Sequence, residues 1–238
     1  MMALVSIEHL HKSFGTLTVL ADLNLEVVEG ELLTIFGPNG AGKTTLLKIL
    51  STLVSSTSGR VVVDGFDVRR NPVEVRSRIG VISHDTYLYR DLTAVENLVF
   101  YARMYDVGDF EERVHEVIRQ VGLKCRENDR VATFSRGMKQ RLSIARAILH
   151  EPKILLLDEP YTGLDRHASN ILDGIIQEFD SRHATRIMVS HDLERGLRFS
   201  NRVLIMKNGV FVHDVRRSEI GSVEEYQGIY EELVGGLS

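Results

Sequence analysis

The residues best suited to chemistry in this sequence lie in the stretch GPNGAGKTT, at positions 37–45. It follows the apolar segment ELLTIF, which has the pattern of a strand, and precedes residues with helical spacing. Glycines let a backbone curl so that several N–H groups point at one anion. The spacing predicts a phosphate-binding loop, in which Lys43 reaches the β- and γ-phosphates of a nucleotide and Thr44 offers its hydroxyl to Mg²⁺. The predicted binding residues are Gly37, Pro38, Asn39, Gly40, Ala41, Gly42, Lys43, Thr44 and Thr45.

Two neighbouring acids follow a second apolar segment. The sequence ILLLDEP, residues 154–160, predicts a buried strand that ends at Asp158. A carboxylate there can hold the hydration shell of Mg²⁺, and Glu159 can orient a water for attack on the γ-phosphate. Acids often end strands, so the pair alone leaves a purely structural interpretation open. Together with the phosphate-binding loop, it indicates nucleotide hydrolysis.

A second potential anion site begins at Ser135, where a short Ser/Gly loop runs into the sequence MKQRLSIARAI. We predict a helix over residues 138–150. The start of a helix leaves backbone N–H groups unpaired and carries a partial positive charge, which suits an anion. The apolar residues of this helix lie on one face, as in an ordinary packed helix. Both interpretations hold, because the helix can pack while its first turn binds, and the residues alone do not say which anion.

The elements that must position these groups alternate between strands and helices at both ends of the chain, and a mostly helical block lies between them. Thr93 and Glu96 form a capping box that opens the first helix of this block. We predict one α/β domain over residues 1–238, with the core and a β-lobe at 1–85 and 151–238 and a helical lobe inserted at about 86–150. Expected strands are 4–10, 23–27, 31–36, 61–68, 79–83, 154–158, 186–190, 202–206 and 210–213, and further helices are expected from 44, over 110–121 and 171–179, and from 222.

The composition excludes several classes of protein. The 238 residues carry a net charge of −4, which argues against a broad nucleic-acid-binding surface, so no nucleic-acid partner is expected. Cys125 is the one cysteine, which rules out a disulfide within the chain and a cysteine-rich metal site. No apolar run approaches the roughly 18 residues of a membrane span. If the protein works at a membrane, we expect it to do so as a peripheral subunit.

Four motifs occur in a characteristic order: GPNGAGKTT, SRGMKQRLSIARA, LLLDEPYTGLD and VSHD. With these motifs the chain resembles the ATP-binding subunits of ABC transporters over nearly its whole length. The resemblance implies a RecA-like P-loop NTPase core, an N-terminal antiparallel β-lobe and an inserted helical lobe. It also implies ATP hydrolysis with ATP and Mg²⁺ as cofactors, and a head-to-tail dimer that holds two ATP molecules between its subunits. The anion at Ser135 would then be the ATP of the partner subunit.

The resemblance also suggests roles for single residues. Ser135 and the N–H of Gly137 would contact the γ-phosphate held by the facing subunit, and Asp165 would sense the other site. His191 would contact the γ-phosphate and hold Glu159 and the attacking water. Phe14 would stack on adenine, with a core role as the alternative. Arg136 stands where the family commonly has glycine, and it would either add charge near the phosphates or face solvent.

The clearest departure from the family follows the strand at 79–83. Most members place a glutamine there that touches Mg²⁺ and the attacking water, whereas this chain has His84 and then Asp85. Mg²⁺ prefers oxygen ligands to a neutral imidazole. We therefore expect Asp85 to take the metal or water contact, alongside Thr44 and Asp158, and His84 to shape the loop. In the alternative interpretation Asp85 faces solvent and His84 senses the nucleotide.

The same resemblance indicates a role in membrane transport. The motifs lie too close together for the long insertions of the soluble repair and chromosome proteins, and the chain has one cassette where the ribosome-acting class has two. The signature region and the stretch SHDTYLYRDLTAVENLVFYARMY most resemble the haem-exporter ATPase of cytochrome c maturation. Exporters of drugs, antibiotics or polysaccharides are the alternative. The chain would lie in the cytoplasm on the inner face of the cell membrane, docked to an integral membrane subunit through its helical lobe near Tyr87, Leu88 and Tyr89.

Overall fold

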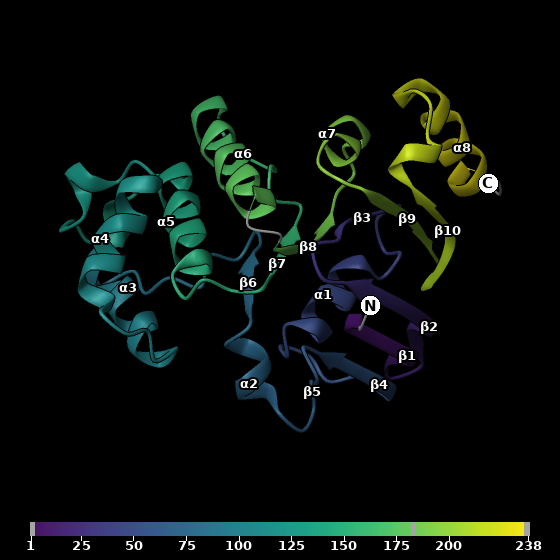
Figure 1. Cartoon of the computed structure of the whole chain (residues 1–238), viewed down its shortest axis with the longest axis horizontal. Helices are drawn as coiled ribbons and strands as arrows, with labels where there is room; N and C mark the ends of the chain where they lie inside the picture. The colour runs from purple at the N-terminus through teal and green to yellow at the C-terminus, as the bar shows by residue number, and fades with distance from the viewer. Residues whose placement is uncertain (1–2, 182–183, 236–238) are drawn as a thin grey trace.

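The computed structural model describes residues 3–181 and 184–235, and its centre is a six-stranded sheet (Figure 1). The strands lie in the order β10-β9-β3-β8-β7-β6. All neighbouring pairs are parallel except β9 and β10, which form an antiparallel hairpin. The strands are β3 (Leu32–Phe36), β6 (Ile79–Ile82), β7 (Ile154–Asp158), β8 (Thr185–Val189), β9 (Arg202–Lys207) and β10 (Val210–Arg216).

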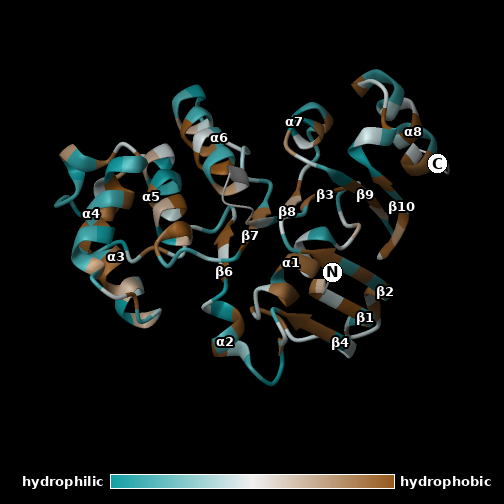
Figure 2. Ribbon diagram, in the orientation of Figure 1, coloured by the Kyte–Doolittle hydropathy of each residue, from teal (hydrophilic) through white to brown (hydrophobic). Residues whose placement is uncertain are grey.

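The central strands are buried along most of their length, which explains their nearly continuous apolar sequences. Helices pack against them: α1 (Lys43–Leu50) follows β3 and α6 (Arg166–Ser181) follows β7. Beyond β8, α7 (Leu193–Arg198) and α8 (Val223–Gly235) join a cluster around Phe36 and Tyr226. In Figure 2 the strands of the small sheet are largely in the hydrophobic colour, whereas the helices of the inserted block mix hydrophobic and hydrophilic colours.

A second, smaller sheet near the N-terminus is antiparallel, with the strand order β2-β1-β4-β5. Its strands are β1 (Ala3–Phe14), β2 (Leu17–Val28), β4 (Ser58–Val63) and β5 (Phe66–Asp67). Alternate apolar residues of this sheet share one core with the buried side of α1. The predicted α/β fold, with a parallel core and an antiparallel β-lobe, is confirmed.

Three helices form the block that is inserted between β6 and β7, drawn in teal in Figure 1. They are α3 (Ala94–Met104), α4 (Phe110–Gln120) and α5 (Arg136–Ile148). The predicted capping box is present, because Thr93 Oγ1 accepts from the Glu96 N–H at 3.1 Å and the Glu96 carboxylate accepts from the Thr93 N–H at 2.8 Å. The block packs against the far end of the main sheet, at β7 and α6.

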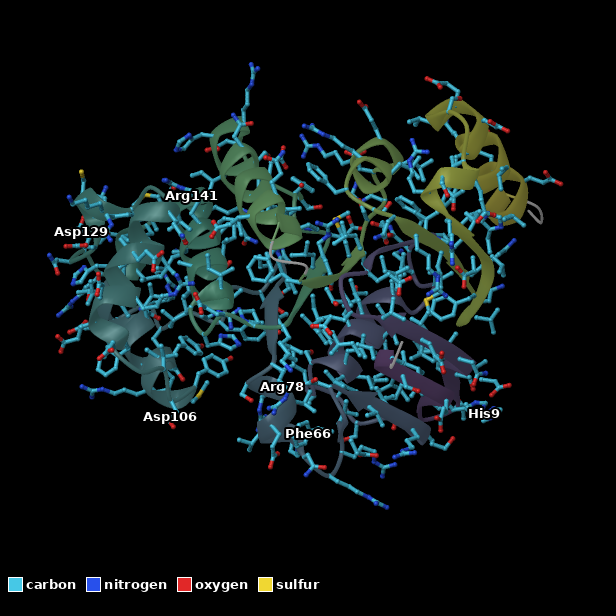
Figure 3. All side chains as sticks on the ribbon, viewed as in Figure 1. His9, Phe66, Arg78, Asp106, Asp129 and Arg141 are labelled. Carbon is cyan, nitrogen blue, oxygen red and sulfur yellow. The ribbon has the colours of Figure 1, made fainter. Side chains whose placement is uncertain are left out.

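Short helices that the sequence did not predict complete the fold. The helix α2 (Pro72–Arg76) joins the small sheet to β6, and α7 follows β8. Next to α2, Arg78 donates to Asp64 at 2.7 Å and lies 4.2 Å over the ring of Phe66, which ties the two sheets together (Figure 3). Short 3₁₀ helices span Lys124–Arg126, Val131–Thr133 and Arg217–Glu219. No helix within the described residues is long and apolar enough to cross a lipid bilayer.

Candidate nucleotide-binding and catalytic site

The residues that we predict to bind and hydrolyse the nucleotide lie together at one edge of the main sheet because of its strand order. The phosphate-binding loop follows β3, Asp158 ends β7, and His191 comes two residues after β8, which lies between these two strands. The segment with His84 and Asp85 follows β6, the neighbour of β7. Since these strands are parallel, their carboxyl ends meet at the same edge, where open α/β sheets bind ligands.

The glycines of the phosphate-binding loop are required by its close fit against neighbouring strands. Gly37 has a φ of 151°, and a side chain there would overlap the carbonyl oxygen of Met206 in β9. Gly42 has a φ of 106°, and a Cβ atom would lie 2.6 Å from Leu20 Cδ2 and 2.8 Å from the carbonyl oxygen of Val19. Only glycine can adopt these positive φ values at positions where a Cβ atom would not fit. The loop is thereby held between both sheets, directly before α1.

Lys43 is the first residue of α1 and it is buried. Its ammonium donates to the carbonyl oxygens of Gly37 at 2.6 Å and Pro38 at 2.9 Å, so that it reaches back across the loop. Burial lowers the pKa of Lys43, and the charges of Glu159 and Asp158 oppose that change. Within the described residues, no carboxylate forms an ion pair with Lys43. The loop therefore presents a charge that an incoming phosphate can neutralise.

Thr44 and Asp158 form a pair of oxygen donors beside the loop. The Thr44 hydroxyl donates to Asp158 Oδ1 at 3.1 Å. Burial raises the pKa of Asp158, and the hydrogen bond from Thr44 opposes this effect. Mg²⁺ takes one or two protein oxygens and completes its shell with water and substrate phosphates, so this pair fits the ion. Among the residues the structure describes, no cluster of three His, Cys, Asp or Glu side chains forms a self-sufficient metal site.

Glu159 and His191 are in direct contact. His191 Nδ1 lies 2.7 Å from Glu159 Oε2, and the His191 backbone N–H also donates to this oxygen at 3.4 Å. Glu159 has a φ of 48°, so its backbone lies in the left-handed region and its side chain leaves β7 in a different direction from that of Asp158. The His191 ring is 70% exposed and faces outward from the edge of the sheet. A carboxylate held in this way can orient and polarise a water molecule.

The segment after β6 completes this edge. His84, Asp85, Thr44, Asp158 and Glu159 line one cavity of about 250 Å³. The charge of Asp85 contributes to the raised pKa of Asp158, which agrees with their closeness. The structure thus places Asp85 beside the proposed metal donors. His84 instead approaches Arg136, whose Nη2 lies 3.5 Å from His84 Nδ1.

The second anion site is a separate group of residues. Ser135 is the N-cap of α5, and its hydroxyl accepts from the Met138 N–H at 3.2 Å. Asp165 lies beside it, because a Cβ atom on Gly137 would be 3.5 Å from Asp165 Oδ2. No hydrogen bond or ion pair within the described residues joins Ser135 or Asp165 to the phosphate-binding loop. Arg136 is exposed, as one of its two interpretations expected, and its guanidinium lies over Gly163, where a Cβ atom would be 2.7 Å from Nη2.

Phe14 ends β1 and is 51% exposed, so the alternative of a core role is wrong. The ammonium of Lys12 lies 4.3 Å over its ring. An exposed ring at this position is free to stack on a ligand, and its contact with adenine stays a prediction.

Sequence reasoning gave no role to Arg146, although this residue has an unusual environment. It lies in α5 and is only 6% exposed, close to Tyr87, Tyr101 and His150. One signal in the sequence was available, because Arg146 comes four residues after Leu142 and three before Leu149, on the apolar face of a helix, where a charge is out of place.

Comparisons with known proteins identify the family. Residues 20–162 match the family described as ABC transporter. NatA of Bacillus subtilis (strain 168), described as an ABC transporter ATP-binding protein, is 38% identical over 195 residues, which cover 81% of this chain and 79% of NatA. The chain belongs to the ABC transporter family. It is an ATP-binding subunit of that family and an ATPase.

Further relatives of this ABC ATPase show how widely the fold is used. The linearmycin resistance ATP-binding protein LnrL of Bacillus subtilis (strain 168) is 33% identical over 97% of this chain and 75% of LnrL. Other relatives are described as ATP-binding proteins for the import of spermidine, iron or sulfate. Among solved structures, the dimeric ATP-binding cassette MJ0796 with ADP and Pi has a TM-score of 0.81 and 27% identity, covering 92% of this chain and all of MJ0796.

Proposed function

We propose that two copies of this chain, or this chain and a similar one, close head to tail over two ATP molecules. The observation that carries the proposal is the separation of two anion sites on one chain. One edge of the main sheet holds Lys43, Thr44, Asp158 and Glu159, while the start of α5 at Ser135 shares no hydrogen bond or ion pair with that loop among the residues the structure describes. A second chain, facing the first, supplies the missing half of each site. The dimeric MJ0796 cassette, a homologue of this chain, supports this arrangement.

In the proposed reaction each residue acts through the geometry described above. Lys43 exchanges its carbonyl partners for the β- and γ-phosphates, and the loop N–H groups bind the remaining oxygens. Glu159 orients a water in line with the γ-phosphate, and His191 fixes the Glu159 carboxylate. Thr44, Asp158 and Asp85 would hold Mg²⁺, which neutralises charge on the phosphates. Ser135 and Gly137 of the facing chain bind the γ-phosphate, so hydrolysis releases the two chains from one another.

The output of this cycle is movement of a membrane subunit docked on the helical block. Tyr87 is 39% exposed and Tyr89 is 49% exposed, in the segment that leads from β6 into α3. Leu88 between them packs against the core of the block, so it serves the fold. Exposed aromatic side chains next to one another are typical of interaction sites. We infer that Tyr87 and Tyr89 lie in the docking surface and that the chain works on the cytoplasmic face of the membrane.

For the transported substrate, we infer haem export of the type linked to cytochrome c maturation. The support is the resemblance of the segments SRGMKQRLSIARAILHEP and SHDTYLYRDLTAVENLVFYARMY to that group. A second candidate is an antibiotic exporter, because the relative LnrL, which matches along 97% of this chain, is described as a linearmycin resistance protein. Both candidates use the same ATPase and differ in the membrane subunit.

Disruption of the gene decides between these substrates. Haem export predicts loss of covalently bound haem from c-type cytochromes, detected by peroxidase staining of membrane proteins. A plasmid with the unchanged gene restores the stain, and one with Glu159→Gln does not. Unchanged cytochromes together with increased sensitivity to linearmycin would overturn haem export in favour of the second candidate.

A further inference from the structure

The short helix α2 and the turn before it carry three exposed arginines, Arg69, Arg70 and Arg76, in a chain whose net charge is −4. In the part of the chain that the structure describes, none of the three forms an ion pair with a carboxylate. The next arginine, Arg78, differs from them, because it is half-buried and pairs with Asp64 at 2.7 Å. The outermost charges of this region are therefore positive, although the whole chain is acidic.

Asp67 fixes the turn that displays two of these arginines. Its Oδ1 atom accepts from the backbone N–H of Arg69 at 2.9 Å and from that of Arg70 at 3.1 Å. Such side-chain-to-backbone hydrogen bonds hold Asp-containing turns in one shape. The half-buried carboxylate of Asp67 is thus engaged by the backbone, and the side chains of Arg69 and Arg70 extend from the turn into solvent.

The helix α2 has one side in the core and one side in solvent. Val75 is fully buried, whereas Val73 is 67% exposed. Arg76 follows Val73 by three residues, so the two side chains lie on the same side of the helix. Glu74, the acid of this helix, is half-buried. Cations around an exposed apolar side chain are the features by which interfacial segments bind a membrane surface.

This region lies on the same side of the molecule as the proposed docking surface. In Figure 1, α2 and the loop before it project at the lower edge. Figure 3 places Phe66, beside α2, and Asp106, just beyond α3, on that same side. Arg76 and Tyr87 line one small cavity, so the two surfaces adjoin. A chain that docks on a membrane subunit through Tyr87 and Tyr89 therefore turns α2 toward the lipid around that subunit.

We propose that the α2 patch, formed by Arg69, Arg70, Val73 and Arg76, binds the anionic phospholipid headgroups of the membrane. The inference rests on the proposed docking to a membrane subunit and adds a direct lipid contact to it. Guanidinium groups bind phosphate through two parallel hydrogen bonds, and Val73 enters the boundary between headgroups and acyl chains. Each basic side chain close to an anionic membrane strengthens binding about fivefold, so three of them contribute about 100-fold. This affinity orients a chain that the membrane subunit already holds nearby.

A phospholipid surface fits the α2 patch better than a nucleic acid does. Nucleic-acid-binding proteins spread their basic residues over a face or along a helix, whereas these three arginines surround a single helical turn. The exposed Val73 gains nothing from a phosphodiester backbone, but it is removed from water when it enters the lipid interface. The predicted ligand is therefore an array of phosphate headgroups above an apolar layer.

Tryptophan fluorescence of the full chain tests the lipid contact at a chosen position, because the natural sequence contains no tryptophan. Val73→Trp places the reporter in the α2 patch, and Leu17→Trp is the matched reporter on β2, where Leu17 is 65% exposed. The probes are vesicles of equal parts phosphatidylglycerol and phosphatidylcholine, and vesicles of phosphatidylcholine alone. At low salt we expect the anionic vesicles to shift the Val73→Trp emission to shorter wavelength, with at least about tenfold stronger binding than the neutral vesicles. About 0.5 M salt should abolish the shift, and Leu17→Trp should not respond.

Charge variants at exposed positions complete the test without disturbing the core. Arg69→Gln together with Arg70→Gln should weaken binding of the Val73→Trp chain to the anionic vesicles about 25-fold. The control pair, Arg119→Gln with Arg216→Gln, makes the same change in charge at two exposed arginines outside the α2 patch and should stay within about twofold.

Four results would each overturn the proposal. They are equal binding to both kinds of vesicle, equal effects of the two arginine pairs, an equal shift of both tryptophan reporters, and a stronger response of Val73→Trp to a DNA oligonucleotide than to the anionic vesicles. The measurement needs no ATP and no membrane subunit, so failure of the lipid contact is distinct from failure of the proposed function.

Discussion

Replacing His191 by alanine removes the 2.7 Å contact of Glu159, the proposed catalytic carboxylate. His191 Nδ1 and Glu159 Oε2 are 2.7 Å apart, a distance that indicates a charge-assisted hydrogen bond. A hydrogen bond to a charged group contributes about 1.5–3 kcal/mol. If this hydrogen bond stabilises only the transition state of hydrolysis, its loss lowers kcat about 10- to 150-fold. ATP affinity should fall much less than kcat, because among the described residues no hydrogen bond joins His191 to Lys43 or the phosphate-binding loop, and only the expected contact of His191 with the γ-phosphate would be lost.

The solvent exposure of the His191–Glu159 pair decides where in this range the loss of kcat falls. The His191 ring is 70% exposed in the single chain, so water competes for the contact and the effect lies near tenfold. Between two closed chains the pair loses that water, and the effect approaches the upper value. The backbone N–H of His191, 3.4 Å from Glu159 Oε2, survives the substitution and preserves some activity.

Single-turnover ATP hydrolysis at saturating ATP measures this change, with nucleotide affinity determined separately. Asp192→Ala is the matched control, because Asp192 caps α7 through the Arg195 N–H at 3.0 Å and, within the described part of the chain, forms no hydrogen bond with Glu159. The control should lose some stability and keep its rate. A normal rate for His191→Ala, or an equal loss of rate in both variants, would refute the role assigned to the His191–Glu159 contact.

Three further predictions test other parts of the account. Gly37→Ala should lower the free energy of unfolding by about 2–5 kcal/mol in denaturant titrations, because the new Cβ atom overlaps the Met206 carbonyl oxygen and the backbone is strained as well. Gly40→Ala should lower it by only about 1–2 kcal/mol, because its Cβ atom would meet open space and only the backbone strain remains. The pKa of His150 is about 4 in the folded chain, below its unfolded value near 6.5, so its contribution to stability is fully present above pH 6.5 and falls by about 3 kcal/mol as the pH drops to 4. His150→Gln should therefore reduce the dependence of the unfolding free energy on pH, measured by chemical denaturation. An unchanged pH dependence would contradict the assignment. Asp85→Ala should raise the Mg²⁺ concentration needed for hydrolysis while Asp85→Gln largely restores it, and a dead His84→Ala beside a normal Asp85→Ala would reverse their roles.

Local signals in the sequence were sufficient for much of the site. The loop spacing predicted the placement of Lys43 and Thr44, and the apolar run before Asp158 predicted a strand that ends at the catalytic edge. The capping box at Thr93 was likewise readable, because both of its hydrogen bonds span three residues. These features are formed by residues close together in the sequence, so the local sequence determines them without knowledge of the tertiary structure.

Features that depend on packing between residues far apart in the sequence could not be predicted from the sequence. Arg146 contacts Val81, 65 residues earlier in the sequence, and nothing local indicates that β6 and α5 enclose its guanidinium. Arg136 is exposed, as one interpretation expected, but its contact with Gly163, 27 residues later, could not be predicted from the local sequence. The helices α2 and α7 have five and six residues, too few to show a helical period.

The central claim is that one chain's phosphate-binding loop and another chain's Ser135 hold the same ATP. Light scattering coupled to size-exclusion chromatography tests it with the Glu159→Gln variant, which should bind ATP and fail to cleave it. With ATP and Mg²⁺ we expect a particle of twice the 26.9 kDa chain mass, and a return to the single mass when Ser135→Arg is added. A Glu159→Gln chain that stays at 26.9 kDa with saturating ATP, or a dimer that Ser135→Arg leaves intact, would contradict it.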